Sequence, residues 1–422
     1  MSTLETERQP LVEAGIVPVH DPEAAASPRL QLGFTTGSLD RTGPLSLETV
    51  TSMQGIEALK EEYDRLNRVT GNGVPFALRG WHLSWCTQWL NCNPRVQDDL
   101  AVHVMRDRTG LCTAIVPMLR SVRAFGPFRV CSFNMLGPDP ALSEVHPSLV
   151  EPGFEAPAAA AIQQYLAATP DWDWVNWSGL SPEFAQALGR HAKLAWLEPQ
   201  RGYLIDLPPS WEQLRARLKR NIREALRHCY NSLKREGLEF ELTVHTEGVE
   251  IAAALERFFE LHAMRAQLGG AASHPDRFRS EGAREFLRDV CARLAARGIA
   301  RVFELEVGGQ VVASRIGFAV GHTLYMYYSG FNPRWARYSV ATTVLAEGIR
   351  YAIACGLKSV DLSPGRIVAK TRWSPREVTY GHAVQFCSDH RAHPARLLYR
   401  LACGDGLASV APLLSRFKRH GN

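Results

Sequence analysis

The chain has 422 residues, 45% of them hydrophobic and 22% charged, which is the composition of a globular protein of about two or three domains. Its net charge of +5 suits anionic ligands without requiring nucleic acid. The scattered cysteines argue against a disulfide framework or a metal site. No long apolar stretch is free of charged residues, so we expect no transmembrane helix. The first residues do not resemble a secretion signal, so we expect a cytoplasmic protein.

The first ordered segment follows a polar N-terminal stretch. Residues 1–45 are rich in Pro, Ser, Thr, Ala and Glu and show no sustained hydrophobic period, so we expect a disordered tail. In the run "SMQGIEALKEEYDRLNRV" the apolar residues share one helical face. Trp81, Trp85 and Trp89 then recur at helical spacing, and this stripe is predicted to belong to a core rather than to a binding platform.

Two stretches of the chain repeat one pattern. "LAVHVMRDRTGLCTAIVPML" and "ARVFELEVGGQVVASRIGFA" each contain two strand-like runs, joined by a turn at Asp107–Gly110 and at Gly308–Gly309. A third strand, a helix and a further strand follow each pair. Antiparallel strands that lead into a strand–helix–strand unit predict a mixed α/β fold, with two tandem units of mostly antiparallel strands and flanking helices.

The repeat also predicts the domain organisation. We expect one domain over 46–205, a second over 206–385 with a basic helical insert at 210–237, and a helical extension over 386–422. Apolar residues recur in the insert at steps of three and four, so a packed amphipathic helix with a solvated or ligand-facing basic side is favoured over RNA contact. Peripheral membrane contact is a minor alternative for the basic C-terminal segment "LASVAPLLSRFKRH".

One strand-to-helix turn has the features of an anion site. In "SGFNPRWARYSVATTVLAEGIRYA", Arg334 and Arg337 precede a helix that begins after Ser339 with small side chains. Small residues let a phosphate approach the backbone amides at a helix N-terminus, and the arginines supply positive charge. An ordinary helix start with solvated arginines is the alternative.

Several segments between residues 50 and 385 carry a family resemblance. They are "VPFALRGWHLSWCTQWL", "SEVHPSLVEPG", "LKRNIREALRHCYNSLKREG", "LHAMR" and the run from Tyr327 to Trp373. In order and spacing they resemble the GNAT acyltransferase superfamily, in particular its tandem-domain CelD/BcsL-like (cellulose-biosynthesis-associated) acetyltransferases, which are related to the FemABX ligases.

The resemblance implies a cosubstrate site at that turn, for acetyl-CoA or another acyl-CoA and without a metal. The pyrophosphate would lie on the helix N-terminus. The matching residues are Arg337, Ser339, Val340, Ala341, Thr342 and Thr343. Alanine at 341 and valine at 340 stand where this branch has glycine and often proline. In the first copy, Glu151 and Glu155 stand at the start of the corresponding helix and would repel a pyrophosphate. The first domain is therefore expected not to bind the cosubstrate and to form a wall of the substrate site.

The resemblance further implies direct attack of an acceptor amine or hydroxyl on the thioester, between two strands that part. Asp361 is the expected base or acceptor anchor, with a buried structural carboxylate as the alternative, and Tyr328 is the second catalytic candidate. The expected substrate-binding residues are Lys370, Trp373, His262 and Arg265. No residue is assigned to protonate the thiolate.

The expected function is therefore an N- or O-acyltransferase of exopolysaccharide or cell-envelope biosynthesis, with a small-molecule or glycan acceptor. Two alternatives stay open. One is a non-catalytic accessory protein of a polysaccharide assembly, which keeps the fold but not the cosubstrate. The other is a FemABX-like aminoacyl transferase that uses tRNA, which the basic residues of the insert would bind.

Overall fold

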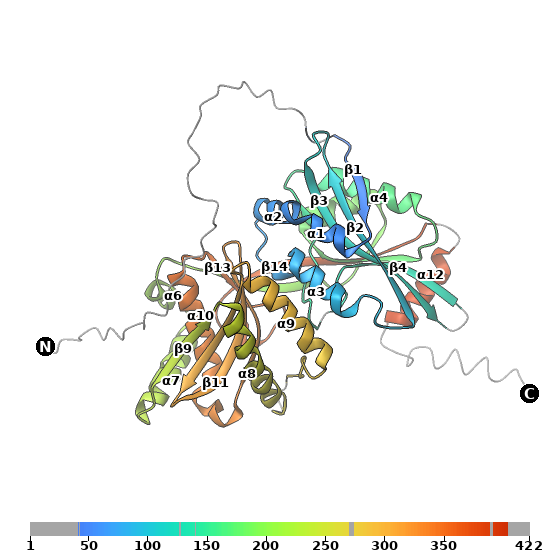
Figure 1. The fold of residues 1–422 in the computed structure, drawn as a ribbon. Helices are drawn as coiled ribbons and strands as arrows, with labels where there is room; N and C mark the ends of the chain where they lie inside the picture. The colour runs from blue at the N-terminus through green and yellow to red at the C-terminus, as the bar shows by residue number, and fades with distance from the viewer. Residues whose placement is uncertain are drawn as a thin grey trace, which may run out of the picture. The chain divides into compact units, whose positions relative to one another are not determined.

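The computed structural model describes residues 41, 43–125, 128–139, 141–269, 274–388 and 391–403 (Figure 1). Most of the expected N-terminal tail and the C-terminal segment after residue 403 lie outside this part of the chain. The described residues form two compact units. We call the described parts of 38–202 and 378–422 the first unit, and residues 203–377 the second unit.

The first unit is built on a mixed sheet. Its strands are β1 (Ser46–Val50), β2 (Val96–Arg106), β3 (Cys112–Phe125), β4 (Phe128–Met135), β5 (Leu149–Val150), β6 (Trp174–Leu180), β7 (Leu194–Trp196) and β14 (Arg376–Phe386). They lie in the order β1-β2-β3-β4-β6-β14, with β5 beside β3 and β7 beside β14. Only β4 and β6 among these pairs run parallel.

Helices of the first unit pack on this sheet or on one another. They are α1 (Met53–Ala58), α2 (Lys60–Val69), η1 (Pro75–Ala77), α3 (Arg79–Trp89), α4 (Glu155–Ala168), α5 (Pro182–His191) and α12 (Ala392–Cys403). Trp81 and Trp85 of α3 are buried, as the helical spacing of the tryptophans predicts, whereas Trp89 is half-buried. The apolar face predicted for 52–69 is also buried, at Ile56 and Leu66.

The second unit contains the second copy of the pattern. Its strands are β8 (Gln200–Asp206), β9 (Phe240–His245), β10 (Ala300–Val307), β11 (Gln310–Val320), β12 (Thr323–Phe331) and β13 (Ser359–Asp361). They lie in the order β8-β13-β12-β11-β10-β9, and β12 and β13 are the parallel pair. The hairpin predicted at Gly308–Gly309 is confirmed, because both glycines have positive φ and join β10 to β11.

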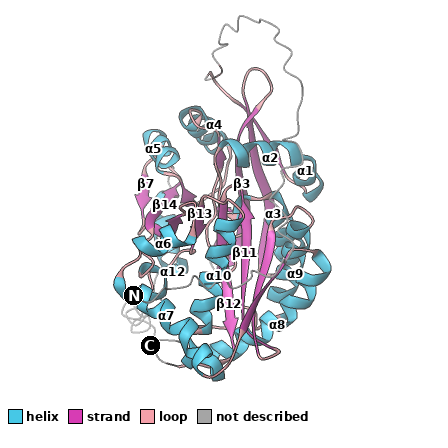
Figure 2. Cartoon of the chain, turned by 90° about the vertical axis from the view of Figure 1, so that its left-hand side faces the viewer, coloured by secondary structure: helices cyan, strands magenta, loops and turns pink. Residues whose placement is uncertain are grey.

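Helices cover both faces of this second sheet. They are α6 (Trp211–Arg217), α7 (Arg220–Arg235), α8 (Gly248–Ala266), α9 (Glu281–Ala295), η3 (Pro333–Tyr338), α10 (Val340–Ala354) and α11 (Val368–Thr371). Figure 2 shows β11 and β12 between α10 and α7 on one side and α8 and α9 on the other. Among the described residues, no helix combines the length and apolar character needed to cross a membrane.

The mixed α/β fold class is confirmed, and one strand lies in a different unit from the one expected. The sequence places residues up to 385 in the second domain. In the structure, Ala383–Phe386 pair with β6 and Ala383–Gln385 pair with β7, so β14 from Val378 onward belongs to the first unit. The strand that follows the second copy therefore completes the sheet of the first.

Candidate functional site

Two central strands of the second unit part from each other. The parallel pairing of β12 with β13 covers only Thr323–Tyr325 against Ser359–Asp361. Beyond Tyr325, β12 continues to Phe331 without β13 as a neighbour. On its other side β12 carries a bulge, because Met326 opposes Gly317 and Ser329 opposes Arg315. A bulge changes the direction in which side chains point, and here it coincides with the strand opening.

The N-terminus of α10 follows directly from this strand edge through η3. Ser339 takes a left-handed conformation with φ of 57°, which ends η3 and starts α10. Its carbonyl accepts the N–H groups of Thr342 at 2.8 Å and Thr343 at 3.1 Å. The N–H groups of Val340 and Ala341 have no acceptor among the described residues. The first turn thus presents unpaired backbone donors and the positive end of the helix dipole.

Side chains of α7 contact this turn: His228 Nε2 lies 3.3 Å from the Arg337 carbonyl oxygen, and Cys229 Sγ lies 3.9 Å from that of Ser339. Val340 is fully buried and packs into the core of the second unit, and Thr343 is also buried. Ala341 and Thr342 are half-buried. The apolar side chain that replaces the expected proline therefore points away from the surface.

Arg372 is a residue of this turn that the sequence analysis missed. Its Nη2 donates to Thr342 Oγ1 at 2.7 Å, while its Nε is buried without a hydrogen-bond partner. No carboxylate in the described part of the chain forms an ion pair with it, and burial lowers its pKa. Its position two residues after Lys370 was the only hint in the sequence that it belongs to the site. Its contact with Thr342 could not be predicted, because the two residues are 30 positions apart.

Arg337, the arginine expected to bind pyrophosphate, already has partners. Its side chain is 70% exposed, and its Nη2 lies 3.2 Å from Glu236 Oε2. The guanidinium also lies 4.6 Å from the centre of the Tyr338 ring, and the Tyr338 hydroxyl donates to the same carboxylate. Arg337 is therefore near the turn but is neutralised by Glu236.

Asp361 and Lys370 both hold the loop that follows β13. Asp361 is buried, and its Oδ1 accepts the N–H of Ser363 at 2.8 Å. Lys370 Nζ donates to Ser363 Oγ at 2.8 Å and also to the carbonyl oxygens of Ser363 and Pro364. Ser363 has a positive φ of 66°, so these bonds stabilise a strained turn.

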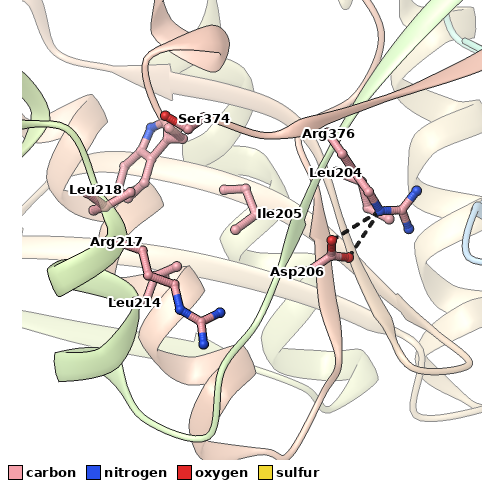
Figure 3. Close-up of a pocket in the computed structure, with 9 residues that line it drawn as sticks. Leu204, Ile205, Asp206, Leu214, Arg217, Leu218, Ser374 and Arg376 are labelled. Carbon is pink, nitrogen blue, oxygen red and sulfur yellow. Dashed lines mark hydrogen bonds and ion pairs between the residues drawn. The ribbon is translucent and has the colours of Figure 1, made fainter.

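Trp373 lines a pocket of the second unit rather than a surface. Its side chain is 1% exposed, and its Nε1 is buried without a partner. The pocket has a volume of about 220 Å³. In Figure 3, Ile205 lies between the Arg217 side chain and the ion pair of Arg376 with Asp206. A second pocket of about 350 Å³ is lined by Tyr203, Lys219, Arg366, Thr371, Ser374, Pro375 and Glu377.

His262, Arg265 and Tyr328 gather where α8 packs on β12. His262 is fully buried, and its Nδ1 lies 3.0 Å from the Ser329 carbonyl oxygen. Its Nε2 accepts the N–H of Arg277 at 3.4 Å, which assigns the proton to Nδ1. Burial lowers the pKa of this imidazole. The Tyr328 ring lies 5.7 Å from that of His262.

Most of the expected site residues fall into three groups in the second unit, while Arg337 is paired with Glu236 and Trp373 lines the pocket. Ser339–Thr343 form the helix turn, Asp361 and Lys370 form the loop after β13, and His262 lies with Arg265 and Tyr328 beside β12. Arg372 links the first two groups through its bond to Thr342.

Residues 217–373 match the sequence model of a family described as "Acetyltransferase (GNAT) domain". This span contains the parted strands and the α10 turn, and it lies within the second unit. The strand order and the repeated pattern define the chain as a protein with two GNAT-like α/β units.

Several solved structures align with this chain at low identity. FemX is similar over 84% of this chain and 100% of its own, with 11% identity and a TM-score of 0.56, a likeness that concerns the fold. A tandem GNAT protein from the clavulanic acid biosynthesis pathway aligns over 82% of this chain and 100% of its own (12% identity, TM-score 0.42). The C-terminal domain of a putative lysylphosphatidylglycerol synthetase from Agrobacterium fabrum aligns over 82% of this chain and 97% of its own, with 11% identity and a TM-score of 0.45. No curated protein matches the chain.

Proposed function

We propose that the chain is an acyl-CoA-dependent N- or O-acyltransferase, with acetyl-CoA or another acyl-CoA as the donor. The observation that carries this proposal is Arg372, a half-buried guanidinium with no carboxylate partner, bonded to Thr342 in the first turn of α10. Together with the unpaired amides of Val340 and Ala341, it offers the donors and the positive charge that a pyrophosphate needs.

The parted edge of β12 would receive the rest of the cosubstrate. Residues 326–331 have no β13 neighbour, and we place an extended part of the cosubstrate beside them. The Ser329 carbonyl is already bonded to Arg265 and lies 3.0 Å from His262 Nδ1, so it is not one of the acceptors for that chain. Acyl-CoA supplies the activated acyl group as a thioester. In this arrangement the amides of the α10 turn and Arg372 bind and orient, and the strand edge excludes water from the reacting end.

Direct attack by an acceptor amine or hydroxyl also requires a proton acceptor. Asp361 remains our proposed base or acceptor anchor, since the N–H of Ser363 fixes its orientation at the end of β13. Tyr328 is the second candidate, beside the strand opening. We place Lys370 as a positioning residue, because its ammonium group holds the Ser363–Pro364 turn.

The acceptor class and the pathway are part of the proposal. Resemblance to the CelD/BcsL-like branch favours sugar amines or hydroxyls of a cell-envelope or exopolysaccharide precursor, made in the cytoplasm where acyl-CoA is present. Mass spectrometry of acetyl transfer onto amino sugars, amino acids and lipid-linked glycans would identify the acceptor.

Thermal unfolding with acetyl-CoA tests the proposal directly. A ligand at a hundredfold excess over its Kd stabilises the folded state by about 2.7 kcal/mol, so a rise in Tm is expected. No shift at millimolar acetyl-CoA would overturn the enzyme assignment. A shift without transfer to any acceptor of the panel would favour a non-catalytic accessory protein.

A second candidate is an aminoacyl transferase that uses tRNA, and the exposed basic side of α7 favours it. Ile222 and Leu226 are buried against the second unit, while Arg220, Arg223 and Arg227 are exposed. Salt-dependent binding of tRNA that is lost in Arg220→Ala/Arg223→Ala would support this candidate, and the same affinity for both proteins would end it.

A further inference from the structure

Two arginines from different elements meet at one serine hydroxyl in the second unit. Arg265 Nη1, from the last turn of α8, lies 2.8 Å from Ser329 Oγ. Arg315 Nη2, from β11, lies 3.2 Å from the same oxygen. Ser329 is buried on β12, directly opposite Arg315 in the strand register. A neutral hydroxyl can accept both hydrogen bonds, but it cannot balance two positive charges.

The described residues supply no carboxylate to this pair. Neither Arg265 nor Arg315 forms an ion pair, and the acids nearby are already bound. Glu304 accepts hydrogen bonds from Arg257 at 2.7 Å and from His245 at 2.8 Å. Asp276 Oδ1 accepts the N–H of Phe278 at 3.0 Å. Two guanidinium groups therefore share one small region without a counter-charge, which is costly in a partly buried position.

Arg315 is a charged residue in the middle of a mostly apolar strand. It is the only charged residue of the strand "QVVASRIGFAV", and its Nε is buried without a hydrogen-bond partner. A charged group in such a strand destabilises the fold unless something binds it. Guanidinium groups are the side chains best suited to bind oxyanions.

The pair lies beside the opening between the two parted strands. Ser329 falls within the part of β12 that has no β13 neighbour, immediately after the bulge at Tyr327 and Tyr328. Arg265 also lies 5.8 Å from the centre of the Phe331 ring, near the end of the same strand. A ligand held by the two arginines would therefore lie at the edge where the acyl group is proposed to react.

We propose that Arg265 and Arg315 bind a carboxylate group of one of the two substrates. One reactant of the enzyme is then an acid, not a neutral compound. The assignment of that acid as substrate rests on the proposed acyltransferase function. One source of the carboxylate is the acceptor, such as an amino acid or an acidic sugar. The other source is the far end of a dicarboxylic acyl group. Both sources present the same planar oxyanion to the two guanidinium groups.

The test compares acids with their amides on the full chain. Thermal unfolding and calorimetry would be measured with malonate, glycine and D-glucuronate, with the three corresponding amides and with inorganic phosphate. Succinyl-CoA would be compared with acetyl-CoA. The variants are Arg315→Met and, as a matched control, Arg293→Met, since Arg293 pairs with Asp289 in α9 away from this cluster.

Wild type is expected to bind at least one acid at least tenfold more tightly than its amide, or succinyl-CoA at least tenfold more tightly than acetyl-CoA. The first result identifies an acidic acceptor and the second an acidic acyl group. Arg315→Met should lose this preference and keep or raise Tm, because an unpaired charge has been removed, while Arg293→Met should keep the preference.

Three outcomes would overturn the proposal: equal binding of acids and amides with no preference for succinyl-CoA, binding of phosphate as tight as that of the acids, or a lower Tm for Arg315→Met. The acid arms contain no CoA, so acid binding can be detected in a protein that fails to bind acetyl-CoA. A failure of the proposed function is thereby distinguished from a failure of the carboxylate site.

Discussion

At the N-terminus of α10, Arg337 and Arg372 differ in what already binds them. Glu236 and Tyr338 hold Arg337, whereas Arg372 has only the Thr342 hydroxyl. We expect Arg372→Ala to weaken acetyl-CoA binding by at least about tenfold, the effect of about 1.4 kcal/mol in binding free energy. Arg337→Ala should weaken it less, because Glu236 already neutralises that charge. Isothermal titration calorimetry with acetyl-CoA measures both effects.

Arg293→Ala is the control for this comparison, since it removes an arginine of the same unit that pairs with Asp289. A larger loss for Arg337→Ala than for Arg372→Ala would place the pyrophosphate on the η3 side of the turn instead.

The charge of Arg315 predicts a pH dependence for the proposed carboxylate site. Burial, with a further contribution from the Arg265 charge, lowers the pKa of Arg315 to about 9. The anion binds the protonated form, so its affinity should be constant below this pKa and fall as the pH rises through about 9. Calorimetric titration with the acid that binds best measures this profile.

The titratable groups around Arg315 come from three elements. They are Arg265 and His262 of α8, His274 and Asp276 of the following loop, and Tyr328 of β12. Burial lowers the pKa of His274 to about 4, so this histidine is neutral over the whole window. In Arg315→Met the fall near pH 9 should be absent, and a fall of the same size there would assign the titration to another group.

At the scale of elements, the contact between α8 and β12 depends on one glycine. A Cβ at Gly330 would lie 2.4 Å from the backbone nitrogen of His262 and 2.5 Å from the Leu261 carbonyl carbon. Backbone atoms cannot move aside as a flexible side chain can, so Gly330→Ala should destabilise the protein by about 1–3 kcal/mol. Urea unfolding of the full chain measures the change in the free energy of unfolding.

Gly248→Ala provides the matched control. Gly248 lies at the start of α8, and a Cβ there would have no atom within 4 Å. Its effect should be neutral or slightly stabilising. Equal effects of the two substitutions would show that α8 can move away from β12 without cost.

Local patterns in the sequence predict most elements, and long-range pairings account for what they miss. The hairpin at Gly308–Gly309 and the helix after Ser339 follow from turn glycines and from apolar residues at helical spacing. The partner of β14 does not follow, because strand pairing across the sheet is not encoded in the strand itself. The contact of Arg372 with Thr342 is missed for the same reason. Arg315 was visible as the only charged residue of a strand that is mostly apolar.

At the scale of the whole molecule, the two copies of the pattern differ at the helix that follows the third strand. In the first unit, Glu155 lies in the first turn of α4, and its Oε2 accepts the N–H of Gly153 at 2.9 Å. Glu151 accepts hydrogen bonds from Arg65 at 2.7 Å and from Arg41 at 3.3 Å. The arginines near α4 are therefore neutralised by the chain's own carboxylate, in contrast to Arg372 near α10.

This asymmetry predicts one acetyl-CoA per chain. An anion approaching α4 would meet the carboxylates of Glu151 and Glu155, whereas the α10 turn has two unpaired amides and an arginine without a carboxylate. Calorimetric titration should give a stoichiometry of one acetyl-CoA per chain. Arg372→Ala should lower the affinity of all the bound acetyl-CoA, not of half of it. A stoichiometry of two, with one site unaffected by Arg372→Ala, would show that the first unit also binds the cosubstrate despite its acidic helix start.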